Sequence, residues 1–125
     1  MKYHRFEDTP VWQEARLFTS TIYQTINKNN KLTRDYSICD QLKRASSSIM
    51  LNIAEGFERG STKDFANFLS IAKGSAGEVR SILYIILDNN YINKNEFEIL
   101  YSQICGISCH ISNFRKYLIE NPRKR

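Results

Sequence analysis

The three cysteines and two histidines are the residues of this 125-residue chain best suited to metal chemistry. Cys105 and Cys109 are spaced i, i+4, so two thiolates on one flank of a helix could begin a zinc site. A closed structural zinc site needs four ligands, and only Cys39, His4 and His110 remain to complete it. Cysteines also act as small, semi-apolar packing residues. We therefore expect reduced structural thiols, no metal and no other cofactor.

The sequence lacks the sets of residues that several kinds of catalytic site require. Di-iron bundles need Glu-x-x-His pairs on facing helices, and this sequence has none. Helical ribonucleases of the HEPN type need an arginine four to six residues before a histidine, which neither His4 nor His110 has. No phosphate-binding glycine loop is present, and no base is placed to activate a serine. We expect a non-enzymatic protein.

Positive charge gathers at the C-terminal end of the chain. The net charge is +5, and residues 115–125 hold five cations against one acid, Glu120. Such an end attracts phosphate backbones or anionic surfaces, although it would serve equally as a solubilising tail. The candidate nucleic-acid contacts are these five cations and, in second place, six from the middle of the chain. They are Arg115, Lys116, Arg123, Lys124 and Arg125, then Lys43, Arg44, Arg59, Lys63, Lys73 and Arg80.

Four segments with helical periodicity must position these side chains. The first begins at Thr9-Pro10, read as an N-cap followed by proline at the first helical position, and ends within residues 27–30. The second runs from about Arg34 to Glu58, and Gly60 closes it. The third begins at residues 61–64, and the fourth runs from the capping box at residues 93–96 to a stop at residues 121–122. The apolar stripes predict four amphipathic helices with short connections.

Short connections between long helices favour an antiparallel up-down-up-down four-helix bundle. The chain contains only two prolines and five glycines, so we expect an all-α single domain over residues 1–125, with a basic tail at about 119–125. No apolar run approaches the roughly 20 residues of a membrane span, and the N-terminal residues lack a signal-peptide pattern. We expect a cytoplasmic protein with no membrane partner.

A narrow polar stripe follows the second predicted helix beside its apolar face. When the second and third segments fold back on each other around Gly60, this stripe faces a similar one on the third helix. We expect a hydrogen-bonded seam that specifies helix register rather than a ligand site. Its residues are Gln41, Ser48, Asn52, Glu55 and Glu78.

The backs of the second and third helices carry small residues where solvated helices usually carry long polar ones. Each of the two interior glycines costs about 1 kcal/mol relative to alanine, and close approach of another backbone would compensate. We predict a subunit interface here; a bundle with tolerated surface glycines is the alternative. The interface residues are Ser47, Leu51, Ala54, Ser70, Gly74, Gly77 and Ser81.

The central part of the sequence carries a specific pattern. It consists of Gln41-Leu42-Lys43-Arg44-Ala45, Ile49, Asn52-Ile53-Ala54-Glu55-Gly56, Arg59, Ser61, Asp64-Phe65, Phe68-Leu69 and Ile71-Ala72-Lys73-Gly74-Ser75. With Val11-Trp12-Gln13 and Ala15 near the start, this pattern resembles the four-helix-bundle proteins encoded in 23S rRNA intervening sequences. The resemblance spans about Arg5 to Leu118. One departure is Ser46-Ser47-Ser48, where alanine is more typical of the family.

The resemblance implies an up-down four-helix bundle without an established enzymatic activity. Relatives include the accessory protein of diversity-generating retroelements, which forms a pentameric barrel and binds nucleic acid and its reverse transcriptase. By resemblance we expect a homo-oligomer, a pentamer, that binds RNA or DNA through backbone contacts, with a reverse transcriptase as one candidate partner. A protein-interaction scaffold without direct nucleic-acid binding is the rival hypothesis.

Overall fold

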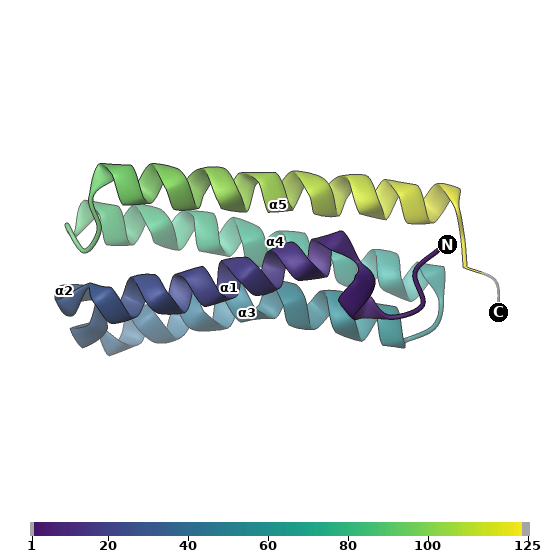
Figure 1. Ribbon diagram of the computed structural model, residues 1–125, viewed down its shortest axis with the longest axis horizontal. Helices are drawn as coiled ribbons and strands as arrows, with labels where there is room; N and C mark the ends of the chain where they lie inside the picture. The colour runs from purple at the N-terminus through teal and green to yellow at the C-terminus, as the bar shows by residue number, and fades with distance from the viewer. Residues whose placement is uncertain (1, 124–125) are drawn as a thin grey trace.

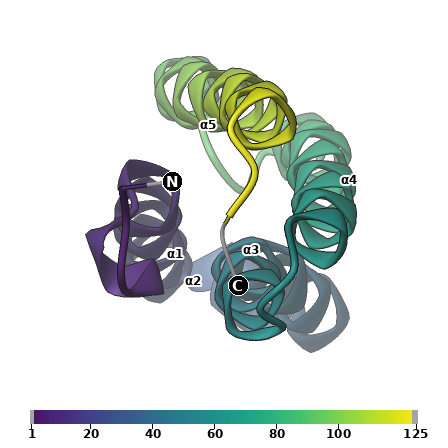
Figure 2. The same ribbon diagram turned by 90° about the vertical axis from the view of Figure 1, so that its right-hand side faces the viewer.

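The computed structural model describes residues 2–123, and all regular structure within that range is helical. The long helices lie side by side (Figure 1), and the end-on view of Figure 2 shows them at the corners of a square. The elements are η1 (Phe6–Asp8), α1 (Pro10–Lys28), α2 (Asn30–Arg34), α3 (Tyr36–Glu58), α4 (Thr62–Asp88) and α5 (Lys94–Glu120). The predicted all-α bundle is confirmed.

The long helices alternate in direction along the chain, so the topology is up-down-up-down (Figure 1). Contacts are most extensive between α3 and α4 and between α4 and α5, and α1 packs mainly on α3. The fourth side of the square, between α1 and α5, has the fewest contacts. The bundle is therefore closed on three sides and more open on the fourth. Across residues 2–123, no helix combines the length and apolarity that a membrane crossing requires.

The short helix α2 was not predicted, because its five residues lie in what the sequence presents as a polar connection. Asn29 takes an extended conformation that ends α1, and Leu32 then turns fully into the core. The Thr33 hydroxyl donates to the carbonyl of Ile26 at 2.6 Å and holds α2 against the end of α1. Burial of one leucine thus stabilises a helical turn in a short connection. Five residues are too few to show a helical periodicity in the sequence.

A side chain caps the helix at two of the three helix starts where the sequence predicts a cap. Asn93 and Glu96 form a full capping box, and Ser61 accepts a hydrogen bond from the backbone N–H of Asp64. The third prediction is wrong in detail, since the Thr9 hydroxyl does not cap α1. It donates backwards to the carbonyl of Phe6 at 2.6 Å, because η1 places that carbonyl within reach.

The core is a single cluster built mostly of aliphatic side chains from all the α-helices. An aromatic group closes it at the end where the α3–α4 turn and the end of α5 lie (Figure 1). Phe65 is fully buried there and packs edge-to-face on Phe57 and on Phe114. At the opposite end, Tyr91 donates its hydroxyl hydrogen bond to Asp35 at 2.8 Å, and Asp35 also accepts from the backbone N–H of Ile38.

Gly56 allows α3 to approach α4 closely. A Cβ added at Gly56 would lie 2.6 Å from the Cβ of Phe68 and 3.1 Å from a ring carbon of Phe65. Both phenylalanines belong to α4, and close packing leaves these atoms little room to move away from an added methyl group. This contact was not predicted. At Gly74 and Gly77, where a subunit interface is predicted, an added Cβ meets no atom of residues 2–123 within 4 Å, so that prediction stays open.

We expect Gly56→Ala to lower the free energy of unfolding by about 1–3 kcal/mol, because it overpacks the α3–α4 contact. Gly106→Ala is the matched control, since Gly106 also lies within a helix but an added Cβ there meets no atom within 4 Å. The control should be neutral or stabilising by up to about 1 kcal/mol. Urea unfolding followed by circular dichroism measures both changes, and equal effects at the two positions would contradict the packing argument.

Candidate nucleic-acid interface

The structure divides the candidate cations by what their side chains already contact. Arg44 forms an ion pair with Asp40 at 2.8 Å, and Arg59 forms one with Glu55 at 2.7 Å. Both pairs are exposed i, i+4 pairs, which contribute little to stability. A phosphate at either arginine would have to compete with the resident carboxylate, so these two positions are weaker phosphate sites than their charge suggests.

Two further candidates lie against the bundle rather than projecting from it. The ammonium of Lys43 lies 5.1 Å from the ring centre of Tyr23, across the α1–α3 contact. Arg115 is half-buried, and its Nε donates to the carbonyl of Ala66 at 3.0 Å, which joins α5 to α4. The charged group of each side chain therefore already contacts a neighbouring helix.

Arg123 closes the aromatic end of the core. Its Nη1 donates to the carbonyl of Phe57 at 2.8 Å and its Nη2 to the carbonyl of Ser61 at 3.2 Å. The guanidinium carbon lies 5.1 Å from the ring centres of Phe57 and Phe65, within range of cation–π attraction. The guanidinium thus satisfies the hydrogen-bonding capacity of one carbonyl at the end of α3 and one in the α3–α4 turn. Lys124 and Arg125 lie outside the described residues.

The remaining candidates are exposed cations on α4 and α5. Lys63, Lys73, Arg80 and Lys116 form no ion pair within residues 2–123. Lys73 and Arg80 are spaced i, i+7, so they share one face of α4. That face borders α5, because the Arg80 guanidinium lies 5.9 Å from the ring centre of Tyr101. Lys116 lies on α5 next to Arg115, which contacts Ala66 of α4. We refer to Lys73, Arg80 and Lys116 as the basic flank.

The polar stripe becomes a small hydrogen-bonded group between α3 and α4. Ser48 Oγ lies 2.9 Å from Ser75 Oγ, and the side-chain amide of Asn52 donates to Ser48 Oγ at 2.9 Å and to the Ser48 carbonyl at 2.8 Å. Gln41, Glu55 and Glu78 are instead exposed at the edges of the contact. The hydroxyl at position 48 therefore has a packing role across the helix pair, which alanine would not fill.

The small residues on the backs of α3 and α4 lie at the surface of the chain. Leu51 is 62% exposed, and Ser70, Gly74 and Ser81 are exposed as well. Ser47, Ala54 and Gly77 are half-buried. Within residues 2–123, no atom lies within 4 Å of a Cβ added at Gly74 or Gly77, so this surface is open at both glycines.

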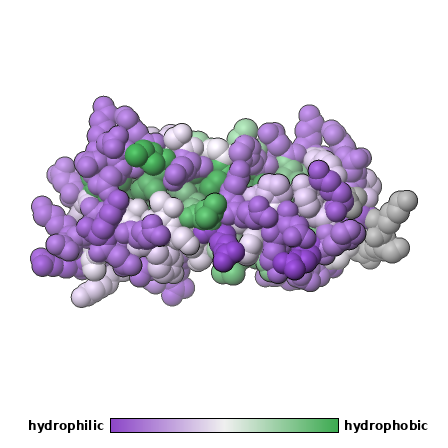
Figure 3. Space-filling model, viewed as in Figure 1, coloured by the Kyte–Doolittle hydropathy of each residue, from purple (hydrophilic) through white to green (hydrophobic). Residues whose placement is uncertain are grey.

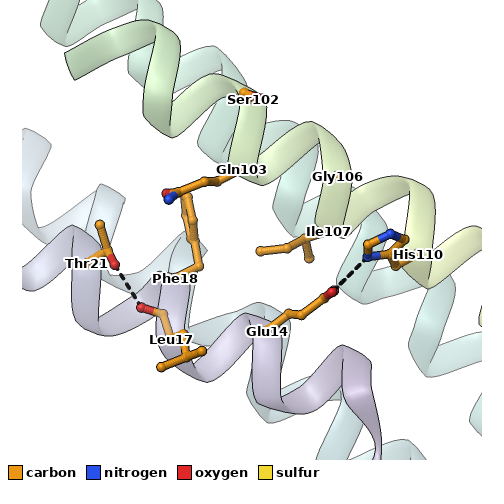
Figure 4. Close-up of a pocket in the computed structure, with 9 residues that line it drawn as sticks. All are labelled: Glu14, Leu17, Phe18, Thr21, Ser102, Gln103, Gly106, Ile107 and His110. Carbon is orange, nitrogen blue, oxygen red and sulfur yellow. Dashed lines mark hydrogen bonds and ion pairs between the residues drawn. The ribbon is translucent and has the colours of Figure 1, made fainter. Parts of the chain in front are cut away.

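A groove runs along the open side of the bundle, and the sequence does not predict it. It has a volume of about 270 Å³ and lies between α1 and α5, where Figure 3 shows apolar surface among hydrophilic side chains. Figure 4 shows Phe18 and Ile107 at its floor, with Leu17, 70% exposed, on its rim. At one end His110 Nδ1 lies 2.9 Å from the Glu14 carboxylate. No spacing rule links residues 14 and 110, so only the fold pairs them.

The cysteines do not form a cluster with other potential metal ligands. The buried Cys39 thiol donates to the carbonyl of Leu32 at 2.8 Å, and burial raises its pKa. Cys105 is half-buried and Cys109 is exposed on α5. Within residues 2–123, no three His, Cys, Asp or Glu side chains come together as a metal site would require.

These features define an all-α four-helix bundle with cations spread over its surface and an apolar groove along one side. Residues 7–113 match the family described as 23S rRNA-intervening sequence protein, and the chain belongs to this family. The fold is similar to a crystal structure from Bacteroides thetaiotaomicron of a protein with unknown function from the S23 ribosomal protein family. The TM-score is 0.76 at 25% identity, over 85% of this chain and 98% of that one. No curated protein matches the sequence.

Replacing Arg123 tests its role in the fold. We expect Arg123→Ala to lower the free energy of unfolding by about 2 kcal/mol, because charge-assisted hydrogen bonds to two carbonyls are lost. The control Lys116→Ala removes an exposed cation of the same end and should change stability by less than about 0.5 kcal/mol. Urea unfolding of the two variants measures the difference, and an Arg123→Ala protein as stable as the control would refute the structural assignment.

Proposed function

We propose that this protein is a non-enzymatic, homo-oligomeric protein that binds RNA or DNA through the phosphate backbone. The observation that best supports binding is the basic flank, whose three exposed cations have no ion-pair partner within residues 2–123. A net charge of +5 favours approach to a polyanion. Family membership supports the same direction, since the family takes its name from sequences within an rRNA gene.

Assembly would multiply a weak contact. A single chain offers a few phosphate contacts, and each contributes modestly at physiological salt. Gly77 is four residues from Lys73 and three from Arg80, so the flank would lie at the edge of each subunit contact. When identical chains assemble, the flank recurs around the oligomer, and one nucleic acid strand can engage several copies. The exposed small residues on the backs of α3 and α4 support this part of the proposal, because Gly74 and Gly77 leave room for another backbone. A pentamer is the form implied by the resemblance to retroelement accessory proteins.

Fluorescence anisotropy with labelled RNA and duplex DNA at low salt tests binding. We expect affinity that is largely independent of sequence and falls steeply with salt, because counterions are released on binding. Substituting glutamine at Lys73, Arg80 and Lys116 together should flatten the plot of log affinity against log salt by about 0.9 per lost phosphate contact on duplex DNA. A control triple at Arg16, Lys31 and Arg34 removes the same charge elsewhere on the surface.

Equal loss in the two triple variants would show a diffuse charge effect and contradict a specific role for the flank. Absence of binding by the unchanged protein to RNA and DNA at low salt would refute the proposed function itself. These substitutions are preferable to truncation after Glu120, because truncation also removes the structural Arg123.

Light scattering on the purified protein at micromolar concentration tests assembly. We expect an oligomer, and we expect Gly74→Ala with Gly77→Ala to shift it toward monomer, because two methyl groups would separate the backbones. If these glycines are merely tolerated surface positions, the double variant keeps its mass and gains up to about 2 kcal/mol of stability. A protein that is monomeric before any substitution would remove the interface hypothesis.

The scaffold hypothesis remains the second candidate, and the groove between α1 and α5 favours it. An apolar concave surface rimmed by an exposed leucine is typical of sites where polypeptides bind. A pull-down that retains one defined protein after nuclease treatment and in high salt, and loses it on Leu17→Glu, would favour the scaffold. A reverse-transcriptase gene beside this one would suggest that enzyme as the partner.

A further inference from the structure

Three aromatic rings lie together at the outer edge of the α4–α5 contact, next to the basic flank. The ring centres of Tyr84 and Phe97 are 5.1 Å apart, those of Tyr84 and Tyr101 are 5.8 Å apart, and those of Phe97 and Tyr101 are 5.3 Å apart. We refer to these three residues as the aromatic patch. No other cluster of three mutually contacting rings is seen within residues 2–123.

The hydrophobic core does not account for the outermost ring. Phe97 and Tyr101 pack partly on the core, whose buried side chains at this end are aliphatic, but Tyr84 is 48% exposed. Its ring rests on two other rings instead of on the core. An exposed aromatic surface held in place from behind is preorganised for stacking, because little side-chain entropy is lost when a flat ligand binds.

The cations of α4 lie on one side of the patch. The Arg80 guanidinium is 5.9 Å from the centre of the Tyr101 ring, and Arg80 is itself exposed. Lys73, Arg80 and Tyr84 are spaced seven and four residues apart, so they fall on one face of α4. The helix rise places Lys73 about 16 Å along the axis from Tyr84, which is enough for a few nucleotides. On the other side, toward the α4–α5 turn, the acids Asp88 and Glu98 outnumber the exposed Lys94, so a polyanion would extend toward Lys73.

We propose that the aromatic patch and the adjacent basic flank form a binding site for unpaired nucleotides. A base stacks on Tyr84, whose ring Phe97 and Tyr101 support from behind, and the phosphates that follow lie near Arg80 and Lys73. Sequence-tolerant stacking beside a cationic track is how proteins hold single-stranded nucleic acid. This inference rests on the proposed nucleic-acid binding and adds that single strands are preferred over duplexes, whose bases are already stacked.

Anisotropy with labelled oligouridine, oligothymidine and a blunt duplex of equal length tests the proposal. We expect the unchanged protein to bind both single strands more tightly than the duplex. Tyr84→Ala should weaken single-strand binding about tenfold, the effect of losing one stacked base. Duplex binding should stay within about twofold. Tyr84→Phe keeps the ring and should bind single strands nearly as well as the unchanged protein.

Tyr36→Ala is the matched control, because Tyr36 is 80% exposed on α3, away from the patch. It should leave every affinity unchanged. A direct readout is Tyr84→Trp in a Trp12→Phe background, in which stacking of a base should quench the single tryptophan. Thermal melting of each variant checks that the fold is retained, as expected for an exposed side chain.

The outcomes separate this inference from the proposed function. If the unchanged protein binds nucleic acid but Tyr84→Ala weakens single-strand and duplex binding equally, or neither, the stacking site is refuted while backbone binding stands. Unquenched tryptophan at position 84 in a saturated complex refutes it as well. If the unchanged protein binds none of the three oligonucleotides, the proposed function fails and the stacking site fails with it.

Discussion

The close approach of α3 and α4 at Gly56 is the contact on which the rest of the bundle is built. Because Gly56 has no Cβ, the helix can pass against Phe65 and Phe68, and the buried ring of Phe65 then receives Phe57 and Phe114 edge-on. Helix α5 is held by this aromatic group, and Arg123 covers it at the end of the chain. Close packing in interiors makes such a contact intolerant of even one methyl group.

This arrangement also explains why one side of the bundle stays open. Helix α5 packs along α4 and α1 packs along α3, so neither depends on the other for most of its buried surface. Their own contact is limited, and the groove between them keeps apolar side chains near solvent, with the Glu14–His110 interaction at one end. The three closed sides carry the stability, while the fourth side and the outer edge of α4 and α5 remain available for other molecules.

Charge composition alone gave an incomplete picture of the candidate site. A count of cations directs attention to the C-terminal residues, yet Arg123 stabilises the end of the core and Arg115 joins α5 to α4. The cations left facing solvent without an ion pair within residues 2–123 include Lys73 and Arg80, from the middle of the chain. An arginine's role depends on whether carbonyls and rings lie within its reach, which is a property of the folded chain.

The sequence by itself determined the helices, because apolar periodicity and capping side chains act over a few neighbouring residues. It also determined the up-down bundle, since short connections leave consecutive helices little choice but to pack antiparallel. Tertiary structure alone decided that Leu32 would draw a connection into a helix and that α3 would approach α4 closely at Gly56. It also decided that Arg80 would lie beside Tyr101. These outcomes depend on residues far apart in the chain, whose pairing is set by how the faces of different helices meet.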